Sequence, residues 1–244
     1  MIFGSAYNLN VLGSNIIPNL MFNNKMLEYV EEFKYLGVLL NPTLSWTNQV
    51  AKTCSTSSRI LYRLRQSAGA MNAAIKRQLV VSLVLPVFDY GAIALTNLNQ
   101  NLEKKLTVAL NNCARFVLRL RLGAHINEPR LELGWLSSKN RRLYLMGCIY
   151  YGVLMLNTNQ LLSNNIRPNH NIARPRRGDR TDSLIAPIPR TAMYQNSFLI
   201  YGTAFWNSLP PQITTSSTLA EFKTQCFKYL QDLEREELGF RPNE

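Results

Sequence analysis

Apolar and polar residues alternate with two different periods along this chain, and the period changes near residue 46. Before that point, short apolar runs are separated by turn residues. The pair Asn23 and Asn24 predicts a hairpin, because asparagine tolerates the positive φ of a tight turn. Ser45 is a predicted N-cap for a helix that begins near Trp46. The run EFKYLGVLL predicts an extended segment with four residues on one face: Phe33, Tyr35, Gly37 and Leu39.

From about residue 46 to residue 156 the apolar spacing is helical. The clearest helix starts at Leu102, and its apolar residues recur every three or four positions. They form one stripe: Leu102, Leu106, Ala109, Leu110, Cys113, Val117 and Leu120. At about 100° per residue, the opposite side of this helix carries Lys104, Arg115 and Arg119.

The last part of the chain predicts a linker followed by a final helix. Residues 167–183 are rich in Asn, Pro and Arg and lack an apolar stripe. Thr218 and Glu221 are spaced as a capping box. The apolar face of the helix that follows comprises Leu219, Phe222, Cys226, Tyr229, Leu230 and Leu233.

These patterns predict an α+β chain that is mostly α. Residues 1–45 form short antiparallel strands, and residues 46–166 form a helical bundle. Residues 167–183 are a linker, and residues 184–244 are a C-terminal extension with a final amphipathic helix.

The charge of the chain narrows the class of partner. Its 244 residues include 27 Lys and Arg against 15 Asp and Glu, a net charge of +12. Residues 51–145 hold fifteen basic and four acidic residues, so this third carries a net +11. Such an excess indicates a polyanionic partner, either nucleic acid or an acidic membrane surface. The concentration of this positive charge in residues 51–145 favours a binding face over a merely solvated surface.

Seven cations are predicted to contact a nucleic-acid backbone. Arg59 and Arg63 repeat the i, i+4 spacing of Arg115 and Arg119, an arrangement that costs a few tenths of a kcal/mol between like charges. The first turn of another predicted helix carries Lys139, Arg141 and Arg142. The macrodipole disfavours cations there, and a bound phosphate would offset the cost. The predicted contacts are Arg59, Arg63, Lys104, Arg115, Arg119, Arg141 and Arg142.

Asp89 is the one charged residue in the apolar run LVLPVFDYGAIAL. Two-metal phosphoryl transfer needs at least two convergent carboxylates, and the acidic residue nearest to Asp89 in sequence is Glu103. Pro86 interrupts the helix ending near Leu85 and starts a new one, whose first turn would contain Asp89. A carboxylate there accepts backbone N–H bonds, so Asp89 is predicted to be structural and not catalytic.

Other catalytic and metal-binding patterns are missing from the sequence. It has no P-loop, GxSxG or HExxH motif, and its cysteines and histidines lack zinc-ligand spacing. We therefore expect no catalytic residue, no metal site and no cofactor in this chain. The most apolar helix candidate, LYLMGCIYYGVLML, is about 14 residues long, shorter than the roughly 20 of a membrane span. No signal peptide is recognised, so the expected location is cytoplasmic or nuclear, without a membrane partner.

Several of these stretches, in this order, resemble the C-terminal part of a non-LTR, LINE-type retrotransposon reverse transcriptase of the jockey-like group. They are FKYLGVLLNPTLSW, LVLPVFDYGAIAL, LNNCARFVLRL, PIPRTAMYQNSFLIYGTAFWNSLPPQI and SSTLAEFKTQCFKYL. The resemblance implies that residues 1–45 are the end of a palm and residues 46–166 a thumb-like domain. It also implies that Phe33, Tyr35 and Gly37 lie near a primer.

The catalytic Asp-Asp turn of that family is absent here, and with it the carboxylates that would bind Mg²⁺. The resemblance therefore implies a thumb-like part of an RNA-directed DNA polymerase, inactive alone, that grips an RNA, DNA or hybrid duplex by its backbone. A missing N-terminal polymerase half would be a further partner. The alternatives are a truncated relic, or an independent RNA-binding or interaction protein.

Overall fold

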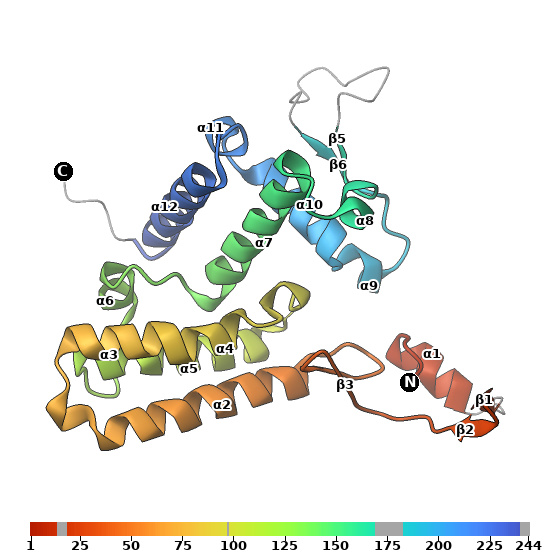
Figure 1. Ribbon diagram of the computed structural model, residues 1–244, viewed down its shortest axis with the longest axis horizontal. Helices are drawn as coiled ribbons and strands as arrows, with labels where there is room; N and C mark the ends of the chain where they lie inside the picture. The colour runs from red at the N-terminus through yellow and green to blue at the C-terminus, as the bar shows by residue number, and fades with distance from the viewer. Residues whose placement is uncertain (14–18, 97, 169–182, 240–244) are drawn as a thin grey trace.

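The computed structural model describes residues 1–13, 19–96, 98–168 and 183–239 (Figure 1). The chain is mostly helical with a few short antiparallel strands, which confirms the α+β, mostly α prediction. The predicted linker falls largely outside the described residues. Its first two residues form strand β5 (Arg167–Pro168), which pairs with β6 (Leu184–Ile185).

The N-terminal segment contains one short helix and two hairpins. Its elements are α1 (Ala6–Gly13), β1 (Leu20–Phe22), β2 (Lys25–Leu27), β3 (Phe33–Tyr35) and β4 (Val38–Leu40). Asn23 and Asn24 turn β1 into β2 with φ of 48° and 58°, as predicted. Helix α1 was not predicted; Ser5 supports its start, because its hydroxyl accepts the N–H of Asn8 at 3.2 Å.

The prediction that residues 33–39 form one extended segment is wrong. Leu36 and Gly37 have φ of 45° and 85°, so they form a tight turn and the chain reverses between β3 and β4. Phe33 therefore pairs with Leu40, and Tyr35 with Val38. Gly37, at the second position of the turn, adopts a positive φ readily. The alternation of apolar residues in the sequence did not indicate this turn.

A first core is built by the helices between residues 47 and 132. These elements are α2 (Thr47–Gln66), η1 (Ala68–Ala70), α3 (Ala73–Leu79), η2 (Val80–Val84), α4 (Leu85–Asp89), η3 (Ala92–Ala94), α5 (Gln100–Leu118) and α6 (Asn127–Glu132). The predicted stripe of α5 is buried in this core from Leu102 to Val117. Asn111 and Phe116 widen it, and Leu120 lies beyond the helix because Arg119 ends it in the left-handed conformation, with φ of 56°.

The start of α2 differs from the prediction. Ser45 does not cap the helix; its N–H donates to Asn41 Oδ1 at 2.9 Å, and its hydroxyl accepts from Asn41 Nδ2 at 2.6 Å. Trp46 holds the N-cap position instead, with φ of 62° and no side-chain cap. The side chain of Asn41 therefore shapes a local turn that competes with a serine cap.

Pro86 does not interrupt the helical path. The preceding residues, η2, form a π-helical turn, and α4 follows it directly with Pro86 in its first turn. A π-turn shifts the hydrogen bonds to i→i+5, which accommodates the missing N–H of a proline. Asp89 consequently is the last residue of α4 and does not lie in its first turn.

The helical stretch Ala73–Ala94 is long and apolar enough to span a membrane by length and composition alone. In the protein, 28% of its most apolar 18-residue part is buried.

A second core lies between α7 (Ser138–Met155) and the C-terminal elements. Those elements are α8 (Gln160–Ser163), α9 (Ala192–Gln195), α10 (Phe198–Ser208), α11 (Pro211–Thr214) and α12 (Leu219–Glu237). Trp206 anchors this core: its ring stacks 5.7 Å from Phe222 and 6.2 Å from Tyr150. Gly202 allows α7 and α10 to approach closely. A Cβ at this position would lie 2.3 Å from the Tyr150 ring.

The predicted cap of α12 is present in a shifted form. Thr218 Oγ1 accepts the N–H of Glu221 at 3.2 Å, while Glu221 reaches back to the N–H and hydroxyl of Ser217 at 2.9 and 2.8 Å. These bonds lower the pKa of Glu221. All six residues predicted for the apolar face of α12 contribute to the second core.

A buried ion pair joins the two cores. Arg130 of α6 and Glu234 of α12 pair with only 3% and 5% of their side chains exposed. Arg130 also donates to the Trp135 carbonyl at 2.6 Å. Glu234 accepts the N–H of Ser137 at 2.9 Å and Nδ2 of Asn140 at 3.1 Å, so it also holds the start of α7. This carboxylate thereby connects α6, α7 and α12.

We expect Arg130→Met to lower the free energy of unfolding by about 3–5 kcal/mol, because it leaves the Glu234 carboxylate buried without its counter-charge. Urea denaturation followed by circular dichroism measures the change. The double variant Arg130→Met, Glu234→Leu should recover part of the loss, since neither charge then remains. A single variant as stable as the wild type would show that the pair does not hold the cores together.

Candidate nucleic-acid interface

The region from residue 51 to residue 145 presents many exposed cations and few exposed carboxylates. Nine of its fifteen basic residues are exposed, and none of the nine forms an ion pair with a described residue. In the same region two acidic residues, Glu128 and Glu132, are exposed. The nine are Arg59, Arg63, Arg65, Arg77, Lys104, Lys105, Arg119, Arg121 and Lys139.

Four of the predicted contacts belong to this exposed set. Arg59 and Arg63 lie one turn apart on α2, and Lys104 lies in the first half of α5. Arg119 follows α5, and its guanidinium donates to the Met71 carbonyl at 3.2 Å. A single bond to a neutral carbonyl leaves the remaining guanidinium donors available to a phosphate.

Arg115 is placed differently from its predicted partners. Its side chain is half-buried and donates to Asn112 Oδ1 and to the Ala124 carbonyl, both at 3.4 Å. Its Nε is buried without a hydrogen-bond partner among the described residues. The guanidinium therefore fastens the loop after α5 and is less open to solvent than those of Arg59 and Arg63.

Arg141 and Arg142 are both engaged within the protein. Arg141 forms a two-pronged ion pair with Asp89, in which its terminal nitrogen lies 2.6 Å from Asp89 Oδ2. Arg142 pairs with Glu103 at 2.5 Å and donates to the Ser138 hydroxyl at 2.8 Å. The cost of placing these cations at the start of α7 is therefore offset within the protein, because each faces a carboxylate of α4 or α5.

The same contact explains Asp89. Its carboxylate is structural, as predicted, but it binds a guanidinium of α7 and does not cap α4. Among the described residues, no group of three or more His, Cys, Asp and Glu side chains could hold a metal ion.

Two exposed cations, Arg65 of α2 and Lys105 of α5, lie near the contact between these two helices. Burial raises the pKa of Cys54 on α2, and Lys105 of α5 is near enough to oppose that shift. Burial likewise raises the pKa of Cys113 on α5 to about 12, and Arg65 of α2 opposes it. Arg65 and Lys105 therefore bring positive charge from two helices to the same part of the surface.

Lys76 adds charge beneath this surface. Its side chain is buried, with the ammonium nitrogen 5.5 Å from the centre of the Phe116 ring. Desolvation and the neighbouring Arg119 both lower the pKa of Lys76. Its apolar stem therefore contributes to packing, and its charge adds to the positive potential at the end of α5.

Hydrogen bonds attach the hairpin β3–β4 to the first core. Lys52 of α2 donates to the Gly37 carbonyl at 2.6 Å, and Gln49 Oε1 accepts the N–H of Leu39 at 3.0 Å. Tyr90 directly follows α4, and its hydroxyl donates to the Leu36 carbonyl. The turn of the hairpin is thus held from two helices.

Two glycines allow this close attachment. A Cβ on Gly37 would lie 3.1 Å from the Tyr90 ring, and a Cβ on Gly91 would lie 2.8 Å from Val38 Cγ2. Both have positive φ, 85° and 68°. The sequences YLGV (35–38) and DYG (89–91), far apart in the chain, therefore interlock.

The predicted primer-proximal residues are divided by the turn. Phe33 and Tyr35 lie on β3 with 52% and 58% of their surface exposed, while Gly37 lies against Tyr90. No described residue before Gln49 is buried. The segment therefore presents its aromatic side chains to solvent.

Sequence reasoning omitted several residues of the candidate interface. Five exposed cations were not selected as contacts, although the same charge count includes them: Arg65, Arg77, Lys105, Arg121 and Lys139. The attachment residues Lys52, Gln49 and Tyr90 carry no sequence signal, because their partners are backbone groups of a turn that was not predicted.

Comparisons with protein-family models, with curated proteins and with solved structures find no match to this chain. The resemblance to reverse transcriptases is thus carried by the sequence stretches alone.

We expect Arg141→Gln to lower the free energy of unfolding by about 1.5–3 kcal/mol, because it breaks charge-assisted bonds to a partly buried carboxylate. Thermal and urea unfolding measure this loss. Arg63→Gln, an exposed cation without an ion pair, is the matched control and should change stability by less than about 0.5 kcal/mol. Equal effects of the two substitutions would contradict the structural role of the Asp89–Arg141 pair.

Proposed function

We propose that this chain binds a nucleic-acid duplex by its phosphate backbone, as the thumb-like part of a retrotransposon RNA-directed DNA polymerase. The observation that carries the proposal is the set of nine exposed cations between residues 51 and 145, none of which forms an ion pair with a described residue. Phosphate contacts fix position without reading sequence, so binding is expected to tolerate any base sequence.

Folding alone does not account for this charge. Exposed like charges oppose compaction, and few exposed carboxylates offset them here. Three other cations of the region, Arg130, Arg141 and Arg142, are each paired with a carboxylate. The contrast between paired structural cations and unpaired surface cations supports an external anionic partner.

The N-terminal segment supports a second part of the proposal: packing against the catalytic half of such a polymerase, which would supply the Mg²⁺ site. Its two hairpins are separate two-stranded sheets, so their outer edges are unpaired among the described strands. Many of its apolar side chains are exposed, including Phe3, Met21, Phe22 and Met26. Open edges and exposed apolar residues favour association with further β structure.

We expect the chain to bind an RNA–DNA hybrid with an affinity that falls about a thousandfold between 50 and 200 mM salt, as roughly six phosphate contacts require. Fluorescence anisotropy with a labelled hybrid measures this. Arg59→Gln with Arg63→Gln should weaken binding and reduce the logarithmic salt slope by about 2.

The control is Lys223→Gln with Lys228→Gln on α12, which removes the same charge from a surface outside the proposed interface. If the control weakens binding as much as the α2 variant, attraction is only a property of net charge. Absence of binding by the wild-type chain would refute the proposed function.

For the N-terminal segment, Met21→Glu with Met26→Lys should reduce self-association while leaving the melting temperature unchanged. The two positions face each other across β1 and β2, so the exchange replaces an exposed apolar pair by an opposite-charge pair. Sedimentation velocity measures the association. Leu161→Lys, an exposed apolar position outside the segment, is the control and should leave association as in the wild type.

A further inference from the structure

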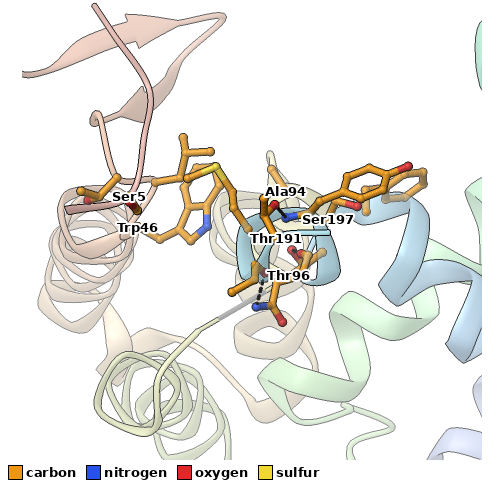
Figure 2. Close-up of a pocket in the computed structure, with 13 residues that line it drawn as sticks. Ser5, Trp46, Ala94, Thr96, Thr191 and Ser197 are labelled. Carbon is orange, nitrogen blue, oxygen red and sulfur yellow. Dashed lines mark hydrogen bonds between the residues drawn. The ribbon is translucent and has the colours of Figure 1, made fainter. Parts of the chain in front are cut away.

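A cavity of about 570 Å³ lies where segments far apart in the sequence meet (Figure 2). Residue 5, residues 43–46, residues 94–96 and residues 191–198 contribute to its wall. It therefore joins the N-terminal segment and the start of α2 to the loop after η3 and to helices α9 and α10. Its size is within the range of sites for small organic ligands.

The wall of this cavity is uncharged. It combines aromatic and aliphatic side chains, among them Trp46, Met193 and Phe198, with the hydroxyl and amide groups of Thr43, Thr96 and Asn196. Such a wall offers no counter-charge to a phosphate or to a cation. It suits a flat, neutral ring that carries hydrogen-bonding groups on its edge.

Several polar groups of the wall, the buried Ser197 Oγ among them, lack a partner among the described residues. The Trp46 indole N–H, a donor, makes no hydrogen bond and faces Thr191 across the cavity (Figure 2). The Asn196 amide donates to the Ala192 carbonyl at 2.9 Å, which leaves its Oδ1 as an acceptor. One donor and one acceptor in an aromatic cavity match the mixed edge of a nucleobase.

The backbone holds this wall at a cost. Leu44 and Trp46 have φ of 51° and 62°, a conformation that bulky residues rarely adopt. The energy of each such residue is about 1–3 kcal/mol, and such residues cluster at functional sites. The turn that creates the strain also places the indole at the cavity.

The cavity and the candidate interface share helix α2. Trp46 precedes its first residue, and Arg59 lies thirteen positions further along, which is about 20 Å at 1.5 Å per residue. Arg190, exposed and without an ion pair to any described residue, precedes Thr191 at the other side of the cavity. Arg190 is therefore next to a neutral aromatic cavity, and α2 leads from the cavity to the cations of the candidate interface. Proteins that bind single-stranded nucleic acid combine aromatic side chains and cations in this way.

We propose that this cavity holds an unstacked nucleobase from a single-stranded extension of the duplex bound along α2 and α5. This inference rests on the proposed function and adds a second, base-dependent site to it. The base would stack on Trp46 and hydrogen-bond to the indole N–H or to Asn196, while Arg190 would contact a neighbouring phosphate. Stacking tolerates different bases, so the site would recognise the single-stranded form more than a sequence.

The test compares three hybrids by fluorescence anisotropy: one blunt, one with a single-stranded extension of adenosines, and one with the same extension made of abasic sugars. The wild-type chain should bind the adenosine extension about tenfold to a hundredfold more tightly than the abasic one. Both strand polarities are tested, because the structure does not orient the duplex.

Trp46→Ala should abolish this preference and leave affinity for the blunt hybrid unchanged. Ala94→Phe fills the cavity from an exposed position without removing a packed side chain, and should abolish the preference in the same way. Tyr62→Ala removes an exposed aromatic residue of α2 outside the cavity and should retain the preference. The far-ultraviolet circular dichroism of each variant verifies folding.

The outcomes separate this inference from the proposed function. Equal affinity of the wild-type chain for the adenosine and abasic extensions would overturn the base site while blunt-hybrid binding still stands. A preference that persists in Ala94→Phe would also overturn it. Failure to bind any of the three hybrids would refute the proposed function and the base site together.

Discussion

The arrangement of this chain depends on a carboxylate held out of water. Glu234 accepts hydrogen bonds from Arg130, from the backbone of Ser137 and from Asn140, so one side chain connects α6, α7 and α12. A buried charge is costly unless it is fully paired, and this requirement allows little freedom in how the elements meet. The two cores, each with its own apolar residues, are thereby fixed relative to each other. The Asp89–Arg141 and Arg142–Glu103 pairs add two further polar links between the first core and α7.

These links separate the cations of the chain into two groups. Some arginines hold the fold together and face carboxylates. Other cations, among them Arg59 and Arg63 of α2 and Lys104 of α5, face solvent. Sequence alone does not distinguish the groups, because Arg141 and Arg59 are equally charged and equally placed on helices. The distinction appears once the three-dimensional partners are known, and it limits the candidate interface to the exposed cations.

Local patterns in the sequence were sufficient for the helical faces and for one turn. The stripes of α5 and α12 could be predicted because burial along a helix repeats with the period of the helix itself. The Asn23–Asn24 turn could be predicted because the residue type matches the required φ. The β3–β4 turn was missed because Leu36, at its first position, is an unusual residue at positive φ. The N-cap prediction at Ser45 was wrong because the Asn41 side chain binds the polar groups of Ser45.

Long-range polar contacts could not be predicted. Arg130 and Glu234 are separated by 104 positions, and neither belongs to a motif. The interlock of YLGV with DYG was visible only as two separate stretches, although each contains a glycine with positive φ. The sequence therefore predicted that the candidate site consists of cations on helices. It did not predict which of these cations are exposed and which are paired within the protein.

The left-handed residue that ends α5 has an implication of its own. Glycine would adopt this conformation without strain, whereas arginine adopts it at a cost of about 1 kcal/mol. Yet the arginine at position 119 places its guanidinium against the Met71 carbonyl and beside Lys76. At position 119, the substitution that would raise thermal stability would therefore also remove a surface charge. A variant selected for heat resistance alone would tend to acquire glycine there and, with it, a less cationic end of the helix.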